Sequence, residues 1–282
     1  MALLETAPNA YFTATYRPGS ASMPKRQAIL ERNAKPLAVE LTKTRDLIKL
    51  TALAQRIVWM AAPDTRFAND PTLKKLVLFS AARSRAWGKT PTCITYISTT
   101  GVYGNAGGEW INERAPVNPQ SDRAKRRVHA EMQLKFGLKL AHKIHILRAP
   151  GIYGHGRLPI DRIRAGTPAL LPQEDSWSNH IHEVDLARLA FWANFKAGTY
   201  KVVNACDEAP CKMGDYFDAV ADAFGLQRPP RLSREEVKKV VSPMMWSFMA
   251  ESRRIESNNQ KSLGFRLRYP TVADYLLTRT SS

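Results

Sequence analysis

Short apolar runs alternate with amphipathic segments along the first 150 residues, and this alternation restricts the fold more than any other feature. Strand-like runs cover residues 10–16, 37–41, 56–61, 92–98 and 143–148. Helical patterns lie between them, over residues 24–33, 45–53, 71–85 and 128–141. Strands separated by helices are typical of βαβ units, in which the strands run parallel. The pattern therefore predicts an α/β protein built on a parallel sheet.

The spacing of the predicted strands and helices changes from residue 151 onward. Loops become longer, and short strands such as residues 199–204 are separated by helices such as residues 213–224. No internal repeat or low-complexity linker divides the chain. We therefore predict two parts, residues 1–150 and a smaller α/β lobe at 151–282, partly interleaved with each other.

The charge balance is strongly basic. The chain has 42 Lys and Arg against 25 Asp and Glu, a net charge of +17 and a pI near 10.0. Such a balance makes nucleic acid or a phosphate-rich ligand a candidate partner. However, the basic residues are spread along the chain, with one dense cluster at 123–127, and diffuse charge is more typical of a solvated surface. A solvated basic surface is therefore favoured over specific nucleic-acid binding.

Several other site classes lack support in the sequence. No apolar run approaches the ~20 residues that cross a bilayer, and residues 1–8 do not resemble a secretory leader. Cys93, Cys206 and Cys211 are too few for a disulfide framework or a zinc site. We therefore expect a cytoplasmic protein with no metal and no membrane partner.

Five segments carry a resemblance to a known family. Residues 97–104 (ISTTGVYG) resemble the strand-end motif of the extended short-chain dehydrogenases/reductases, which include the NAD-dependent nucleotide-sugar epimerases and dehydratases. The other four follow in the same order and spacing: 147–154 (LRAPGIYG), 179–186 (NHIHEVDL), 200–210, and 252–271 with its SRR, LGF and YPT elements. The chain is most similar to the atypical branch of the family. The resemblance implies a Rossmann-like, doubly wound parallel sheet that binds NAD or NADP, with a C-terminal substrate lobe.

The N-terminus departs from the family pattern. Such folds open with a strand, a glycine-rich turn and a helix whose N-terminus receives the cofactor pyrophosphate. Here residues 1–6 resemble the tail of that first helix, and residues 10–16 resemble the second strand. The first strand and the glycine-rich turn are therefore expected to be missing, most simply because the chain begins after them. We expect a sheet without its central strand, with impaired dinucleotide binding, and an upstream segment encoding a G-x-x-G-x-x-G turn.

The second departure concerns the catalytic residues that the resemblance implies. In the family, a Ser or Thr hydroxyl orients the substrate, a Tyr transfers a proton, and a Lys one helical turn later lowers the pKa of that Tyr. Thr99 matches the hydroxyl, but Arg123 and Arg127 occupy the Tyr and Lys positions. An arginine does not release its proton at neutral pH. Either another acid serves, with Tyr103 or Tyr153 as candidates, or the pocket binds without turnover.

The resemblance also implies a set of cofactor contacts. Arg17 ends the strand at which NAD-binding relatives carry an acidic residue, so a cation there favours the additional phosphate of NADP. Arg127 could hold ribose or phosphate oxygens. The remaining implied contacts are Glu40, Leu41, Ala61, Ala62, Pro63, Ser98 and Pro150.

In the substrate lobe, His180 and His182 alternate, so both side chains are expected on one face of a strand. A metal site using this pair and Asp185 is one interpretation. The family pattern instead favours His180 as a weakened phosphate contact and His182 as structural. Asn179 and Tyr153 are the other expected substrate contacts.

Two functions remain open at this point. The first is an atypical NAD(P)-binding epimerase- or dehydratase-like protein that acts on or binds a nucleotide-sugar-type substrate. The second is a non-enzymatic cofactor-sensing or RNA-associated module on the same fold.

Overall fold

The computed structural model describes residues 2–5, 11–19, 22–86, 92–140, 142–196 and 198–280. The chain forms two compact units. Unit 1 comprises residues 1–98, 125–147 and 187–202, and unit 2 comprises residues 99–124, 148–186 and 203–282. The chain thus passes between the units several times. In the described residues, no helix is long and apolar enough to cross a membrane.

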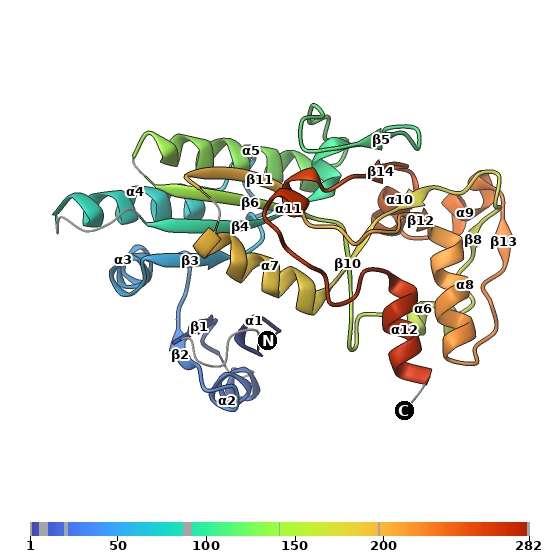
Figure 1. Ribbon diagram of the computed structural model, residues 1–282, viewed down its shortest axis with the longest axis horizontal. Helices are drawn as coiled ribbons and strands as arrows, with labels where there is room; N and C mark the ends of the chain where they lie inside the picture. Colours follow the sequence, from blue (N-terminus) through green and yellow to red (C-terminus); the bar gives the residue numbers. More distant parts are fainter. Residues whose placement is uncertain are drawn as a thin grey trace. The chain divides into compact units, whose positions relative to one another are not determined.

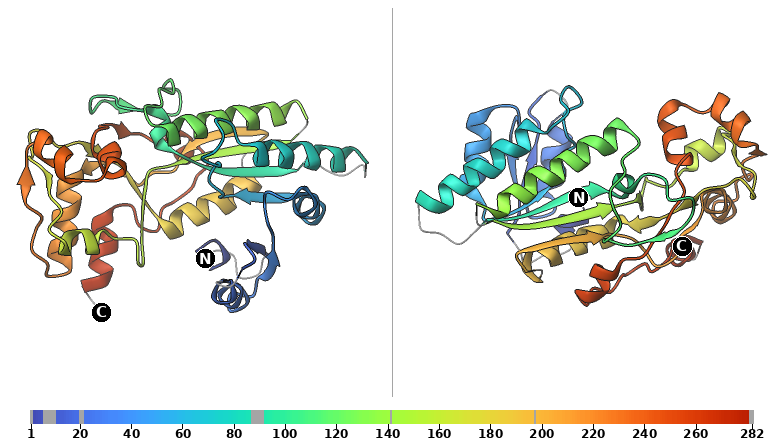
Figure 2. Two further views of the ribbon diagram at one scale, coloured as in Figure 1. Left: turned by 180° about the vertical axis from the view of Figure 1, so that it is seen from behind. Right: turned by 90° about the horizontal axis from the view of Figure 1, so that it is seen from above.

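Unit 1 is an α/β unit with a four-stranded sheet in the order β11-β6-β4-β3. Helices α4 and α5 lie against one face of this sheet and α7 against the other (Figures 1 and 2). Some of its elements continue into unit 2 at one end. The elements are α1 (Ala2–Glu5), β1 (Thr13–Tyr16), α2 (Met23–Leu30), β2 (Lys35–Ala38), α3 (Thr44–Leu53), β3 (Arg56–Trp59), α4 (Pro71–Ala86), β4 (Cys93–Thr99), α5 (Asp122–Leu138), β6 (Lys143–Ala149), α7 (Glu183–Lys196) and β11 (Tyr200–Asn204).

The first two strands stand apart from the larger sheet. β1 pairs with β2 in parallel, with Thr13 opposite Lys35 and Tyr16 opposite Ala38. Among the described strands these two form a sheet of their own, and β3 is an edge of the four-stranded sheet, paired only with β4. This topology agrees with the expectation that the sheet lacks the strand that would join them.

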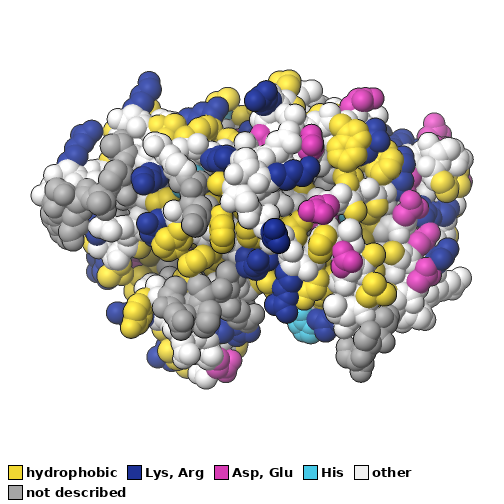
Figure 3. Space-filling view, viewed as in Figure 1, with side chains coloured by type: hydrophobic (Ala, Val, Ile, Leu, Met, Phe, Trp, Pro, Cys, Tyr) yellow, Lys and Arg dark blue, Asp and Glu magenta, His cyan; other side chains and the backbone are white. Residues whose placement is uncertain are grey.

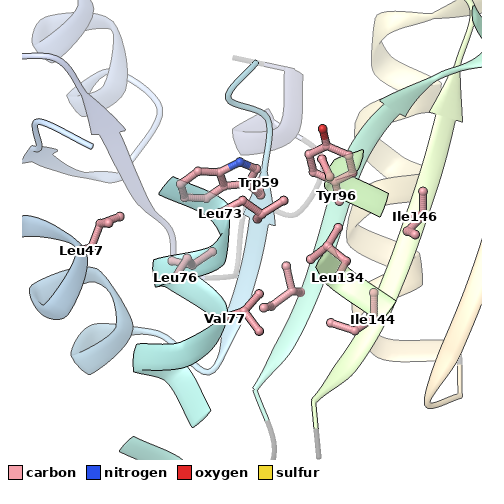
Figure 4. Close-up of a cluster of buried hydrophobic side chains, with 11 residues drawn as sticks. Leu47, Trp59, Leu73, Leu76, Val77, Tyr96, Leu134, Ile144 and Ile146 are labelled. Carbon is pink, nitrogen blue, oxygen red and sulfur yellow. The ribbon is translucent and has the colours of Figure 1, made fainter. Parts of the chain in front are cut away.

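The core of unit 1 lies between the sheet and its helices (Figure 4). Leucines from α3 and α4 meet aromatic and branched side chains of the strands, and each is almost fully buried. The repeat of Leu73, Leu76 and Val77 along α4 gives the helix one apolar face. The buried cluster consists of Leu47, Trp59, Leu73, Leu76, Val77, Ile94, Tyr96, Ala130, Leu134, Ile144 and Ile146.

Unit 2 joins short helices to four two-stranded pairs. The pairs β7–β10, β8–β13 and β5–β14 are parallel, and β9–β12 is antiparallel. Its core contains Tyr153, Phe217 and Tyr275. The elements are the 3₁₀ helix η1 (Thr100–Tyr103), β5 (Trp110–Ile111), β7 (Gly151–Tyr153), α6 (Ile160–Arg164), β8 (Ala169–Leu170), β9 (Trp177–Ser178), β10 (His180–His182), β12 (Cys211–Lys212), α8 (Met213–Ala223), β13 (Arg231–Leu232), α9 (Arg234–Val240), α10 (Pro243–Met249), β14 (Arg254–Ile255), α11 (Asn258–Ser262) and α12 (Val272–Thr280).

The strands and helices predicted before residue 150 are all present. The largest difference in bounds is at α5, which begins at Asp122, six residues earlier than the apolar periodicity indicates. The Ser121 hydroxyl accepts a hydrogen bond from the Ala124 backbone N–H at 3.2 Å. This local cap supports a first turn whose charged side chains hide the periodicity.

Candidate functional site

The end of β4 carries the hydroxyls that the sequence singled out. In unit 1, the buried Ser98 donates its hydroxyl to Glu131 Oε1 at 2.6 Å. In unit 2, Thr99 Oγ1 accepts the Gly101 backbone N–H at 3.2 Å and so caps η1. Thr99 is only partly buried. Its oxygen is the acceptor in this contact, so the contact does not use the hydroxyl proton. Of the two, Thr99 is therefore the better placed to donate to a ligand.

Arg127 is fixed to the strand end in unit 1. Its Nη1 donates to the Tyr96 hydroxyl and to the Ile97 carbonyl, each at 2.8 Å. Its guanidinium carbon also lies 5.4 Å from the centre of the Tyr96 ring. Burial raises the pKa of Tyr96 to about 12, so this hydroxyl stays protonated at neutral pH. Arg127 is thus a positioned cation and not a freely solvated one.

Arg123, which the sequence resemblance matched to the family's tyrosine, has a different environment within unit 2. Its guanidinium carbon lies 4.2 Å from the centre of the Phe248 ring, on α10. This distance fits a cation–π contact. Arg123 therefore holds its guanidinium against an aromatic face.

Tyr103 is buried within a polar network of unit 2. Its hydroxyl donates to Asn204 Oδ1 at 2.7 Å and accepts from Arg148 Nη1 at 2.8 Å. Burial raises the pKa of Tyr103. Because its proton is already donated to Asn204, this geometry favours a structural role over that of a catalytic acid.

Tyr153, the other candidate acid, lies in the unit 2 core. Its ring centre is 5.2 Å from that of His182 and 5.6 Å from that of Tyr275. Burial raises the pKa of Tyr153, and its hydroxyl is enclosed. A hydroxyl that solvent does not reach is poorly suited to transfer a proton to a bound molecule.

The two strand ends expected near the adenosine half of a cofactor carry opposite charges. Arg17 directly follows β1, and its Nε lies 3.9 Å from Glu40 Oε2, beyond the end of β2. The side chain of Arg17 is 80% exposed and that of Glu40 is 25% exposed. The Asp46 carboxylate accepts the Glu40 backbone N–H at 2.9 Å and holds this turn in place. The Arg17 side chain is therefore accessible to a ligand, whereas a hydrogen bond holds the Glu40 turn.

The other expected cofactor contacts differ in accessibility. After β3, Ala61 is half-buried, Ala62 is exposed and Pro63 is buried. Leu41 packs against the unit 1 core. Pro150 is half-buried between β6 and β7 in unit 2. Small side chains at 61 and 62 leave room at the strand end, and Ala62 is the most accessible of this group.

The described residues lack an obvious cradle for a pyrophosphate. Between β1 and α4, Gly19 is the one described glycine that follows a strand. A glycine-rich turn lets the backbone N–H groups approach the phosphates without a Cβ between them. The fit is therefore partial, because strand-end cations are available but a phosphate-binding turn is not.

The two histidines of β10 are both buried in unit 2, and the centre of the Tyr153 ring lies 6.4 Å from that of His180 and 5.2 Å from that of His182. The His180 ring lies 4.3 Å from that of Tyr216, and its Nε2 is 3.2 Å from Ser178 Oγ. His182 Nδ1 accepts the Val184 backbone N–H at 3.2 Å at the start of α7. Within the described ranges, no group of three or more His, Cys, Asp or Glu is arranged to hold a metal ion.

Asn179 and Asp185 both hold backbone segments of unit 2. The Asn179 side chain donates to the Arg253 carbonyl at 2.9 Å and accepts the Ile255 backbone N–H at 2.8 Å. The Asp185 carboxylate accepts the backbone N–H groups of Arg268 and Tyr269, each at 2.8 Å. Both residues lie in segments that resemble family motifs, and these contacts give each of them a structural role.

The burial of His180 has a testable consequence for stability. Burial lowers the pKa of His180 to about 4, below the ~6.5 of an exposed histidine. The unfolded chain therefore binds this proton first as pH falls. The free energy of unfolding is therefore unaffected by this group above pH ~6.5. It falls by about 3 kcal/mol as the pH drops from ~6.5 to ~4. Urea unfolding at several pH values should show this loss.

A matched pair of variants isolates the His180 contribution. His180→Leu should reduce the pH dependence of the free energy of unfolding, whereas His129→Leu, at an exposed position of α5, should leave it unchanged. An unchanged slope in His180→Leu would show that this histidine is not the titrating group.

Two partners in the site were not among the residues predicted from the sequence. Phe248 lies more than 120 residues from Arg123, and nothing in its local pattern distinguishes it from a core aromatic residue. Tyr96 stands two residues before Ser98, where alternation along the strand gives a usable signal that the two share a face. A long-range contact such as that between Arg123 and Phe248 can be identified only from the folded structure.

Comparison with solved structures identifies the fold. A functionally unknown conserved protein from Silicibacter pomeroyi DSS is similar over 99% of this chain and 93% of its own, with 27% identity and a TM-score of 0.79. The UDP-glucose 4-epimerase of Thermotoga maritima, solved with UDP-glucose, is similar over 99% and 93%, with 16% identity and a TM-score of 0.75. The chain has the fold of the extended short-chain dehydrogenases/reductases.

This extended dehydrogenase-like fold is also that of the human epimerase family protein SDR39U1, solved with NADPH. The likeness covers 96% of this chain and 99% of the human one, with 12% identity and a TM-score of 0.69. No family model and no curated protein matches the sequence. The resemblance read from the five motifs is thereby confirmed at the level of the fold.

Proposed function

We propose that this protein is a cytoplasmic NAD(P)-binding protein with a nucleotide-sugar-type ligand, and that it lacks the Tyr–Lys proton transfer of its fold relatives. The observation that carries the proposal is the fixed Arg127 guanidinium at the end of β4. It stands at the family's lysine position and is held there by a strand carbonyl and a buried tyrosine hydroxyl. A cation held in this way suits ribose or phosphate oxygens.

The missing proton donor defines what such a site can do. A nicotinamide dinucleotide, when bound, supplies a hydride donor or acceptor. Hydride transfer at a carbinol also needs a group that takes up or gives a proton. Arg123 cannot do so near neutral pH, because an arginine side chain does not release its proton there. Thr99 can donate a hydrogen bond to a ligand oxygen and so contributes orientation.

A cofactor-sensing module without turnover is the second candidate function. The stacking of Arg123 on Phe248 favours it, because this contact fills the catalytic tyrosine position with a side chain that has no acid–base role. Both candidates require dinucleotide binding. They differ in whether the bound nicotinamide is oxidised or reduced.

We expect NADP to be preferred over NAD because of Arg17. The exposed guanidinium can reach the additional ribose phosphate, and a charge-assisted hydrogen bond of this kind contributes about 1.5–3 kcal/mol. Arg17→Glu should weaken NADP binding by about tenfold or more, because exposure favours the lower end of that range. NAD binding should change much less. Isothermal titration with each dinucleotide measures both effects.

Lys35→Glu provides the matched control for this experiment. It makes the same change of charge at the opposite end of β2, on an exposed side chain. Equal losses of NADP binding in Arg17→Glu and Lys35→Glu would indicate a general charge effect, and unchanged NADP binding in Arg17→Glu would exclude the assigned role of Arg17.

A further inference from the structure

The net charge of the protein resides entirely in unit 1. Unit 1 contains 24 of the 42 Lys and Arg but only 7 of the 25 Asp and Glu, which gives it +17. Unit 2 contains 18 basic and 18 acidic residues and is neutral. A bias shared by the whole chain would charge both units, so the excess belongs to a particular part of the molecule.

The acidic side chains visible in one view follow this division. Asp and Glu lie mainly over the elements of unit 2, whereas Lys and Arg occur over both units (Figure 3). Unit 1 therefore presents cations with few neighbouring carboxylates to neutralise them. Such a surface attracts polyanions over long distances.

Within unit 1, two neighbouring helices hold a concentrated part of this charge. Residues 43–53 and 71–86, which form the cap of α3, α3 itself and α4, contain seven Lys and Arg and one acidic residue. The acidic residue is Asp46, whose carboxylate binds the Glu40 backbone N–H and is 14% exposed. We call the exposed cations of these helices the basic stripe: Lys43, Arg45, Lys49, Lys74, Lys75 and Arg85.

Contacts between the helices set the direction of the basic stripe. Lys75 Nζ lies 3.4 Å from Thr44 Oγ1 at the start of α3, and Arg83 donates to the Ala54 carbonyl just after its end, at 3.2 Å. The two helices therefore run side by side in the same direction. Lys74 and Arg85 are eleven residues apart on α4, which places them on one face about 16 Å from each other.

This length and charge exceed what a dinucleotide requires. A dinucleotide carries only a few phosphates in one cluster, whereas a nucleic-acid strand carries a phosphate at every residue along its length. Cations spaced along about 16 Å of helix suit the second pattern. Because unit 2 has no net charge, it adds no net electrostatic repulsion of a nucleic-acid strand.

We propose that the basic stripe on α3 and α4 binds the phosphate backbone of nucleic acid, independently of the dinucleotide. The interaction is electrostatic and reads the backbone, not the base sequence. No contact between the stripe and the proposed dinucleotide residues is needed for it.

The test uses fluorescein-labelled single-stranded RNA of about 16 nucleotides and follows anisotropy at several salt concentrations. The wild-type protein should bind with an affinity that falls as salt rises. Lys49→Gln/Lys74→Gln/Lys75→Gln should reduce the slope of log affinity against log salt by about 2, because each lost phosphate contact contributes about 0.7. Its affinity at low salt should fall by about tenfold or more.

The control variant is Lys238→Gln/Lys239→Gln, which removes two adjacent exposed lysines from α9 in the neutral unit 2. It should bind RNA as the wild type does. Three results would overturn the proposal: equal loss in the control, displacement of RNA by NADP, or binding to anionic phospholipid vesicles that exceeds binding to RNA. Circular dichroism spectra of all variants verify that each is folded.

Discussion

Introducing the Tyr–Lys pair that the sequence resemblance implies at positions 123 and 127 should produce the largest functional change available in this chain. Arg123→Tyr/Arg127→Lys is expected to raise the rate of nicotinamide oxidation or reduction by about 100-fold or more, because a positioned proton-transfer group contributes about 10²–10⁴ to such rates. The lysine would stabilise the tyrosinate one helical turn away. Absorbance of the nicotinamide, followed with a panel of nucleotide sugars, measures the rate.

The single variants separate the two positions. Arg123→Tyr alone should gain less than the double variant, because the Arg127 guanidinium is engaged by Tyr96 and the Ile97 carbonyl. Arg127→Lys alone should gain nothing, since no proton donor is added. A double variant that binds dinucleotide yet stays as slow as the wild type would contradict the assignment of Arg123 to the tyrosine position.

Loss of Arg231 should have the largest effect on stability. Its guanidinium contacts Asp218 Oδ2 at 2.7 Å and Asp175 Oδ2 at 3.3 Å, and the Asp175 side chain is only 1% exposed. Burial raises the pKa of Asp175 despite two backbone N–H donors. Arg231→Met leaves that buried carboxyl without its cation and should lower the free energy of unfolding by about 3–5 kcal/mol. Urea unfolding provides the measurement.

An exposed ion pair serves as the matched control. Arg228 and Asp222 form a 2.7 Å pair, but their side chains are 62% and 51% exposed. Arg228→Met should therefore lower the free energy of unfolding far less than Arg231→Met does, because solvent screens the exposed pair. A second variant probes the same buried cluster: a Cβ on Gly214 would overlap the Arg231 guanidinium, so Gly214→Ala should destabilise despite the better helix propensity of alanine. Similar small losses for Arg231→Met and Arg228→Met would refute the role given to burial.

Much of the fold could be predicted because local patterns and the tertiary structure agree. The alternation of β3, α4 and β4 is visible in the sequence, since buried strands read as apolar runs and α4 repeats its leucines at helical spacing. The separation of β1–β2 from the larger sheet also followed from motif order. The short paired strands of unit 2 were harder, because two-residue strands have no periodicity to detect.

The candidate site was only partly predictable. Strand-end position singled out Thr99, because the carboxyl ends of parallel strands carry ligands in this class of fold. Spacing along the following helix, matched to the family motif, singled out Arg127. The partners that decide how these residues behave come from distant segments, as Phe248 does for Arg123 and Asn204 for Tyr103. The segregation of charge between the units was likewise invisible in a chain whose basic residues look evenly spread.

The most direct test of the account is a titration of the wild-type protein with NADPH that records nicotinamide fluorescence and absorbance together, before and after the addition of a nucleotide sugar with a keto group, which can accept a hydride. The account predicts a saturable fluorescence change and no rapid oxidation of the nicotinamide. Saturation should require high concentrations, because no glycine-rich turn cradles the phosphates in the described residues of unit 1. Absence of binding to NADPH and to NADH at millimolar concentration, or rapid oxidation on addition of the sugar, would contradict it.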